Sequence, residues 1–191
     1  MHLILTSLLI LVQANTPLFE NDYVRVFKNA APCASPAPAC GETIIVALGP
    51  TELAGQKMVR GDIKGFKKGE KYAAPSGGDY LQVVMKPTRP AVKTPPVKIP
   101  AKGNTIIYDS ERFFIFEEKL PVGGYRERHS HNQRLVVNIN PTQLEQKVDG
   151  QDKPVIRDSI ADDVHFNEPI VHDTKNIGKL PMRNIVIELK P

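Results

Sequence analysis

The stretch LVVNINPTQL, residues 135–144, decides the fold, because a second stretch of the chain repeats it. Residues 44–53 are IIVALGPTEL, and at one constant offset a valine, the Pro-Thr pair and the final leucine of the two stretches coincide. Two more pairs of similar stretches flank this match in the same order. Before it, NDYVRVFKN of the first copy resembles SERFFIFEE of the second, and after it, LQVVMKP resembles IVIELKP. Three ordered matches predict two copies of one structural unit.

The apolar segments of both copies have the character of β-strands. They are short, rich in Val, Ile, Phe and Tyr, and bounded by Gly, Pro, Asn and Asp, which indicates strands joined by turns. We therefore predict an all-β chain without long helices, with a double-stranded β-helix, or jelly-roll barrel, in each half. The expected strands are residues 23–27, 43–48, 80–85, 105–108, 112–117, 134–139 and 184–189.

A proline-rich stretch separates the two copies. Between residues 88 and 103 prolines alternate with Lys and Arg, a density that neither a packed helix nor a central strand tolerates. This composition is typical of a semi-rigid linker. It predicts an N-terminal domain of residues 15–87 and a C-terminal domain of residues 104–191.

The first residues resemble an export signal. The apolar run LILTSLLILV, residues 3–12, has the length of a signal-peptide core but is too short to span a bilayer. Small residues at Val12 and Ala14 favour cleavage after Ala14, giving a signal peptide of residues 1–14 and a periplasmic or secreted protein without a membrane span in the mature chain. A buried N-terminal strand or a misassigned start is the alternative.

Only two cysteines occur, Cys33 and Cys40, within the stretch PCASPAPAC. In an oxidising compartment such a pair is most simply a disulfide, whereas two free thiols in a Pro/Ala-rich loop are the alternative. The net charge of +4 is spread along the chain, which disfavours nucleic-acid binding. We expect a small-molecule ligand, and either a monomer or a homodimer joined through sheet edges.

Apart from His2, every histidine lies in the second copy. If GGYRERHSHNQRLVV is a strand, alternation places Tyr125, Glu127, His129 and His131 on one face and the intervening arginines on a solvated face. Two imidazoles spaced two residues apart can bind one metal ion. His172, in EPIVHDTKN, can add a third nitrogen from a neighbouring strand, whereas His165, in the turn-like DDVHFNE, is more typical of a solvated or outer position.

These residues resemble the two motifs of the cupin superfamily, the RmlC-like jelly rolls. Gly123 is followed after five residues by His129-x-His131, and His172 is followed after three residues by Asn176, with Gly178 and Pro169 nearby. The resemblance implies a two-cupin chain, or bicupin. It also implies that His129, His131 and His172 hold a divalent metal, which can be Fe, Mn, Zn, Ni or Cu.

The sequence departs from the cupin pattern in two respects. The family expects a glutamate four or five residues after the second histidine, where this chain has Leu135 and Val136. Glu127, Tyr125, Gln133 or water would then complete the site. In the first copy the constant offset puts Pro38 and Cys40 in place of the histidine pair, so the N-terminal half is expected to lack metal ligands.

The sequence favours two functions over a third, an envelope or secreted scaffold whose Pro/Lys linker contacts polyanions. One is a metal-binding cupin, in which Arg134 reaches the site only if a bend or bulge turns it from its outward position. The other is a non-catalytic module that binds a sugar or small molecule without metal, its histidines forming hydrogen bonds in a polar barrel mouth. Because the sequence contains no nucleophile–base pair, phosphate loop or paired-carboxylate motif, no catalytic residues or reaction are assigned.

Overall fold

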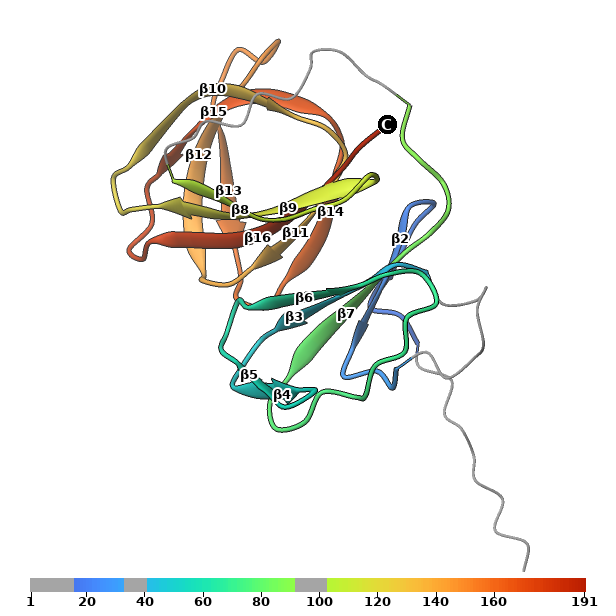
Figure 1. The fold of residues 1–191 in the computed structure, drawn as a ribbon. Helices are drawn as coiled ribbons and strands as arrows, with labels where there is room; N and C mark the ends of the chain where they lie inside the picture. The colour runs from blue at the N-terminus through green and yellow to red at the C-terminus, as the bar shows by residue number, and fades with distance from the viewer. Residues whose placement is uncertain (1–15, 33–40, 92–102) are drawn as a thin grey trace, which may run out of the picture.

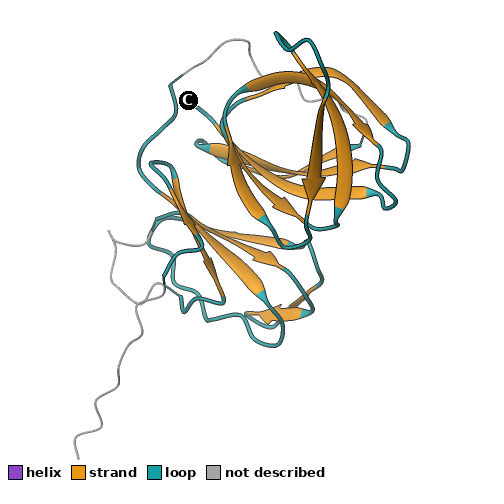
Figure 2. Ribbon diagram, turned by 180° about the vertical axis from the view of Figure 1, so that it is seen from behind, coloured by secondary structure: helices purple, strands orange, loops and turns teal. Residues whose placement is uncertain are grey.

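All regular structure in the described residues is β-strand. The computed structural model describes residues 16–32, 41–91 and 103–191, and these contain sixteen strands and no helix (Figures 1 and 2). The all-β prediction is confirmed, and each of the seven expected strands is present with ends shifted by at most three residues. Among the described residues no helix is long and apolar enough to cross a membrane.

Several expectations concern other parts of the chain. The leader of residues 1–14, Cys33 and Cys40 all lie outside the described residues, as does most of the expected linker. The signal peptide, the disulfide and the domain boundaries therefore stay predictions.

The N-terminal half contains one five-stranded antiparallel sheet and a hairpin. The sheet has the order β1 (Phe19–Glu20), β2 (Val24–Lys28), β7 (Tyr80–Met85), β3 (Thr43–Ala47) and β6 (Ile63–Phe66). The hairpin consists of β4 (Thr51–Leu53) and β5 (Gln56–Met58). Ala54 and Gly55 both have positive φ, 51° and 77°, as the tight two-residue turn of such a hairpin requires.

The C-terminal half is a barrel with two walls (Figure 1). One wall has the strand order β14 (Val164–Asn167), β11 (Arg134–Asn138), β16 (Met182–Leu189), β9 (Phe113–Leu120) and β8 (Asn104–Asp109). The other has the order β10 (Tyr125–His131), β15 (Ile170–Asn176), β12 (Thr142–Val148) and β13 (Val155–Ser159). All neighbouring strands pair antiparallel, as in a jelly roll.

The repeat seen in the sequence recurs in the strand order and in the register. The order β1-β2-β7-β3-β6 corresponds strand by strand to β8-β9-β16-β11-β14. Val46 lies opposite Leu81, as Val137 lies opposite Ile185 in the second copy. In the described residues of the first half, however, no strand corresponds to β10 or β15. The strands that carry the three histidines therefore belong to the second half alone.

The two five-stranded sheets pack face to face and share one core. Ile44 and Val46 of the first sheet are buried in the same cluster as Leu135, Val137 and Ile187 of the second. Ile45 alternates to the other face of β3 and packs against the β4–β5 hairpin. Burial on both faces explains why β3 and β11 are continuous apolar or buried runs rather than alternating ones.

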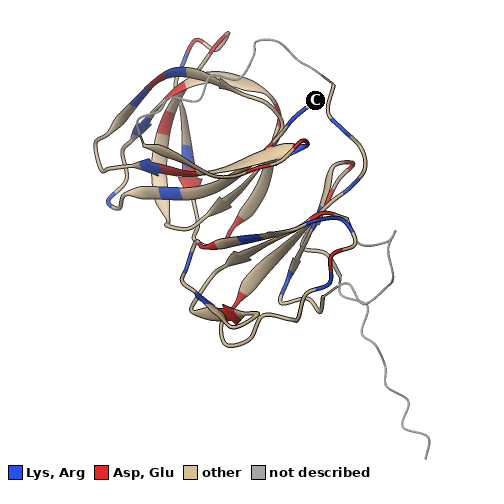
Figure 3. Cartoon of the chain, viewed as in Figure 1, with Lys and Arg blue, Asp and Glu red and all other residues tan. Residues whose placement is uncertain are grey.

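A small polar network also joins the halves. Arg60 donates a hydrogen bond of 2.7 Å to the carbonyl of Ile139 and pairs with Asp162 at 2.6 Å. Arg183 in turn donates a hydrogen bond to the backbone carbonyl of Arg60. Acidic and basic residues otherwise occur in both halves of the drawn chain (Figure 3).

Candidate metal centre

Three histidines converge on the inner face of the β10–β15 wall. In the antiparallel ladder His129 lies directly opposite His172, and His131 lies two residues further along β10. Each of the three is only 4% exposed, and their candidate ligand nitrogens lie within 4.8 Å of one another. The structure thus brings together the three residues that the motif spacing singled out.

The Nδ1 atom of each histidine is directed at a neighbouring oxygen. The Nδ1–oxygen distances are 2.7 Å from His129 to the carbonyl of Glu127, 2.9 Å from His131 to Glu188 Oε2, and 3.4 Å from His172 to Thr174 Oγ1. By contrast, Nε2 of His129 and Nε2 of His172 are buried without a hydrogen-bond partner. A carbonyl accepts a hydrogen, so His129 carries its proton on Nδ1 and presents a free lone pair at Nε2.

Burial also sets the protonation of the site. It lowers the pKa of His172 to about 2, with further lowering by His129, by His131 and by the charge of Arg134. Burial likewise lowers the pKa of His129, and that of His131 well below its usual range. The imidazoles are therefore neutral at neutral pH, which is the form that binds metal ions.

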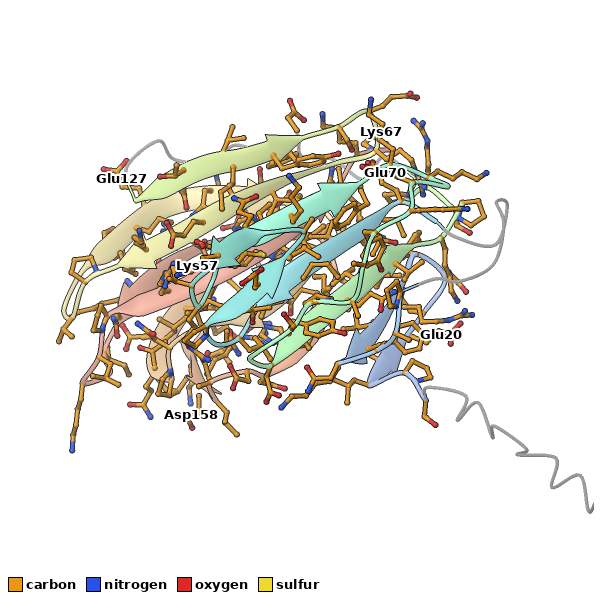
Figure 4. The ribbon with its side chains drawn as sticks, turned by 60° about the horizontal axis from the view of Figure 1, so that its bottom comes forward. Glu20, Lys57, Lys67, Glu70, Glu127 and Asp158 are labelled. Atoms are coloured by element: carbon orange, nitrogen blue, oxygen red, sulfur yellow. The ribbon has the colours of Figure 1, made fainter. Side chains whose placement is uncertain are left out.

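A β-bulge changes which side chains of β10 face inward. The register shifts between Arg126 and His129, so that Glu127 and Arg128 together stand opposite a single residue of β15. The prediction that Tyr125 and Glu127 share the face of the histidines is wrong. Glu127 is exposed at the outer margin of the barrel (Figure 4), and Tyr125 is 55% exposed. The Tyr125 hydroxyl donates outside the site, to Asp173.

The arginines also differ from the sequence expectation. The bulge turns Arg126 inward, where it is buried and paired with Glu118 of β9. Arg134, expected to point outward, is only 7% exposed and lines the barrel cavity. The two-residue connection between β10 and β11 breaks the alternation on which that expectation depended.

Two carboxylates that the sequence reasoning missed lie inside the barrel. Glu188 of β16 is fully buried, and one oxygen contacts His131 while the other accepts the backbone N–H of Asn132 at 2.6 Å. Burial raises the pKa of Glu188 to about 8. Burial also acts to raise the pKa of Glu118, but the Arg126 charge beside it holds that pKa below its usual value. A single glutamate within the apolar run IVIEL was the available signal for Glu188.

The two positions at which the cupin pattern expects a glutamate face opposite ways. Leu135 is fully buried in the core shared by the two halves. Val136 faces the cavity and clusters with Phe116 and Val186. The Phe116 ring lies parallel to the His131 ring at 6.2 Å between centroids. An apolar layer thus occupies the side of the cavity where the motif places a carboxylate.

The barrel encloses a cavity of about 600 Å³, which His131 and His172 line. This volume is in the range of small-molecule sites. His165 of β14 also lines it and lies opposite Val136, with its Nδ1 3.9 Å from Asp163. His165 is outside the three-histidine group, as expected, but it lies in strand β14 rather than in the turn that its sequence suggested.

Comparisons with known proteins agree with this architecture. No protein-family model matches the chain, and no curated protein sequence does. Among solved structures, a cupin 2 conserved barrel domain protein from Leptotrichia buccalis matches with a TM-score of 0.55 at 11% identity, covering 92% of this chain and 88% of that one.

The chain has the cupin fold.

Two further structures share this cupin fold over both halves. AerE from Microcystis aeruginosa matches with a TM-score of 0.55 at 14% identity, covering 93% of this chain and 97% of that one. An oxalate decarboxylase structure matches with a TM-score of 0.57 at 13% identity, covering 87% of this chain and 69% of that one. Because the matches include the N-terminal sheet, the cupin likeness extends beyond the histidine-bearing barrel. At these identities it concerns the fold.

Proposed function

We propose that this protein is an exported metal-binding cupin whose C-terminal barrel holds one divalent ion through Nε2 of His129, His131 and His172. The observation that carries the proposal is the pair of buried Nε2 atoms, of His129 and His172, without hydrogen-bond partners. A buried polar atom without a partner is costly, and metal coordination removes that cost. The oxygens held at the Nδ1 atoms are the outer partners that metal-binding histidines use.

The donor set favours certain ions and leaves room for a ligand. Imidazole nitrogens suit Zn, Cu, Fe and Ni, and Mn is a further candidate from the cupin resemblance. With three protein ligands an ion keeps open positions, and it then polarises a bound oxygen or activates water. In this chain Glu188 orients His131, and Arg134 lies in the same cavity.

A second function is favoured by the cavity itself. Its volume of about 600 Å³ and its amide- and arginine-bearing lining suit a non-catalytic module that binds a sugar or small molecule without metal. In that protein the ligand, rather than an ion, would hydrogen-bond to the free Nε2 atoms.

Elemental analysis of the purified mature chain, residues 15–191, distinguishes the metal-binding cupin from the metal-free binding module. The protein is stripped with a chelator, reloaded with Zn²⁺ or Mn²⁺ and desalted. We expect one ion per chain in the wild type and less than a tenth of that in His129→Ala, His131→Ala and His172→Ala. His165→Ala is the matched control, because it removes a cavity-lining imidazole outside the group. A wild type that retains no ion contradicts the metal proposal.

The export proposal rests on the apolar run and small residues of the leader. Intact mass of the protein recovered from its native compartment is expected to correspond to a chain that begins at Asn15. The same spectrum, recorded before and after reduction, is expected to differ by two hydrogens if Cys33 and Cys40 are joined. A chain that retains Met1 contradicts cleavage.

A further inference from the structure

Arg134 is a buried cation without an acidic partner. Its side chain is at the start of β11, only 7% exposed, and lines the cavity beside His131 and His172. Nη1 donates to two backbone carbonyls, of Asn132 at 3.3 Å and Glu168 at 3.2 Å. Within the described part of the chain, neither Nη2 nor Nε makes a hydrogen bond, and no carboxylate oxygen lies within 4.0 Å of the guanidinium.

The carboxylates around Arg134 already have other partners. Glu168, whose backbone carbonyl Arg134 contacts, accepts a hydrogen bond from Gln133 Nε2 at 3.2 Å. Glu188 lies opposite Arg134 in the β11–β16 ladder, but its two oxygens contact His131 and the N–H of Asn132. Glu118 is paired with Arg126. A buried charge is costly unless it is paired, and Arg134 is a buried positive charge that the described residues do not neutralise by contact. A guanidinium presents its donors as a fork that matches a carboxylate.

The remaining lining indicates an organic ligand rather than a bare inorganic ion. Val136 gives the cavity an apolar surface two residues from Arg134 on β11. Beyond it Asn138 and Asn184 lie opposite each other, and both amide atoms of Asn138 are buried without a partner. Leu144 and Met182 add apolar surface past this asparagine pair. Arg134 and Asn138 are four residues apart on one strand, or about 13 Å. The cavity thus offers a buried cation and a pair of amides with an apolar surface at Val136 between them, and Asp158, Asp163 and Glu168 also belong to its lining.

We propose that this cavity takes a small organic carboxylate, with its carboxylate group bound by Arg134 beside the three histidines. The inference rests on the proposed function in taking the C-terminal barrel as the ligand site, and it adds the chemical class of the ligand. A dication on neutral imidazoles would increase the positive charge around Arg134 and so favour an anion further.

The test compares ligands that differ in charge but hardly in shape. Acetate, propionate and benzoate are each titrated against the corresponding amide, with chelator-treated mature chain and with Zn²⁺-loaded chain, by ligand-observed NMR or calorimetry. In the metal-free wild type we expect at least one carboxylate to bind about 10-fold or more tightly than its amide, as expected for a charge-assisted hydrogen bond. If no carboxylate is preferred over its amide, the inference is overturned.

Variants locate the preference. Arg134→Gln is expected to bring carboxylate and amide to within about twofold of each other, and Arg134→Lys to keep part of the preference, because it keeps the charge. Arg128→Gln is the matched control, since that arginine is exposed on the outer side of β10 and paired with Asp149. A preference that survives in Arg134→Gln overturns the assignment. If Arg134→Gln does not fold, the wild-type comparison and Arg134→Lys still decide it.

The same samples separate this inference from the metal proposal. Bound metal without a carboxylate preference overturns the inference and leaves the metal proposal standing. A carboxylate preference in a protein that retains no metal supports the inference and contradicts the metal proposal. The imidazole NMR signals of His131 and His172 are expected to shift with the preferred carboxylate, and unchanged signals would place binding elsewhere and overturn the proposal.

Discussion

The contact between Glu188 and His131 bears directly on the proposed metal site. If Nδ1 of His131 carries the ring proton, Glu188 Oε2 accepts it and fixes the orientation of the ring, so that Nε2 is presented to the cavity. Glu188 is itself held by the backbone N–H of Asn132. In the proposed metal site, the fully buried Glu188 therefore acts through His131, whereas the glutamate that the cupin pattern expects on β11 would bind the ion directly.

Glu188→Gln is expected to weaken Zn²⁺ binding by about 10- to 100-fold. Without the carboxylate partner, the His131 imidazole is less basic and its ring is held less firmly in place. Competition with a chromophoric chelator measures the affinity. Glu127→Gln is the control, since that side chain is exposed outside the barrel and only its backbone carbonyl contacts His129. Equal affinities of the wild type and Glu188→Gln would show that the contact has no such role.

Burial of titratable groups also gives the metal-free protein a defined stability profile. The folded-state pKa of His172, about 2, is below the value of about 6.5 in an unfolded chain, so the unfolded state binds the extra proton as pH falls. The stability that depends on neutral His172 is present above pH 6.5 and decreases below it. Glu188 acts oppositely, because its folded-state pKa of about 8 exceeds the unfolded value of 4.5.

We therefore expect the chelator-treated protein to be most stable near pH 6.5. Thermal unfolding between pH 4 and 9 is the measurement. In His172→Gln, stability should fall less steeply below pH 6.5, because one group fewer takes up a proton on unfolding. In Glu188→Gln, the decrease in stability between pH 6.5 and 8 should be smaller. A profile that is the same in both variants and the wild type would contradict these assignments.

Among the elements, β10 separates what the sequence could predict from what it could not. Apolar patterning predicted the long strands, and motif spacing brought His129, His131 and His172 to one place. The assignment of side chains to the two faces of β10 by strict alternation was wrong before His129. A bulge adds one residue to the strand there, and nothing in the sequence indicates it. Alternation also failed at Arg134, which follows a turn, and the role of Glu188 depends on a cross-sheet contact with a residue 57 positions away.

The opposite orientations of Leu135 and Val136 on β11 can be tested by placing the family's glutamate at each position. Val136→Glu puts a carboxylate into the cavity, and we expect Zn²⁺ binding to tighten about 10-fold while the metal-free protein loses stability, since a buried carboxylate is costly. Leu135→Glu puts the same group into the core between the halves, so we expect it not to fold. Chelator competition and circular dichroism measure both. Similar behaviour of the two variants would contradict the orientation of β11.

For the whole molecule, two sheets of the same strand order pack against each other around one core. Both keep the same strand order and register, but only the second half retains, among the described residues, the wall that carries the histidines. The first half instead covers the outer face of the second-half sheet, where Phe113, Ile115 and Ile187 would otherwise meet water. Its contribution to the site is therefore indirect: it supports the strand that carries Glu188.

Ile44→Asp tests this dependence from a distance, because Ile44 is fully buried between the halves and belongs to the half without histidines. An unpaired carboxylate there costs several kcal/mol, a large share of the roughly 5–15 kcal/mol that stabilises a domain. If the halves form one cooperative unit, Ile44→Asp abolishes folding and Zn²⁺ binding together, whereas Lys64→Asp on the exposed side of β6 leaves both nearly unchanged. Slowed hydrogen exchange at β16 and retained Zn²⁺ binding in Ile44→Asp would show instead that the barrel folds alone. One face of β16 packs against the first half, and the opposite face carries Glu188. We therefore expect the barrel to lose both its fold and its Zn²⁺ binding when the first half is unfolded.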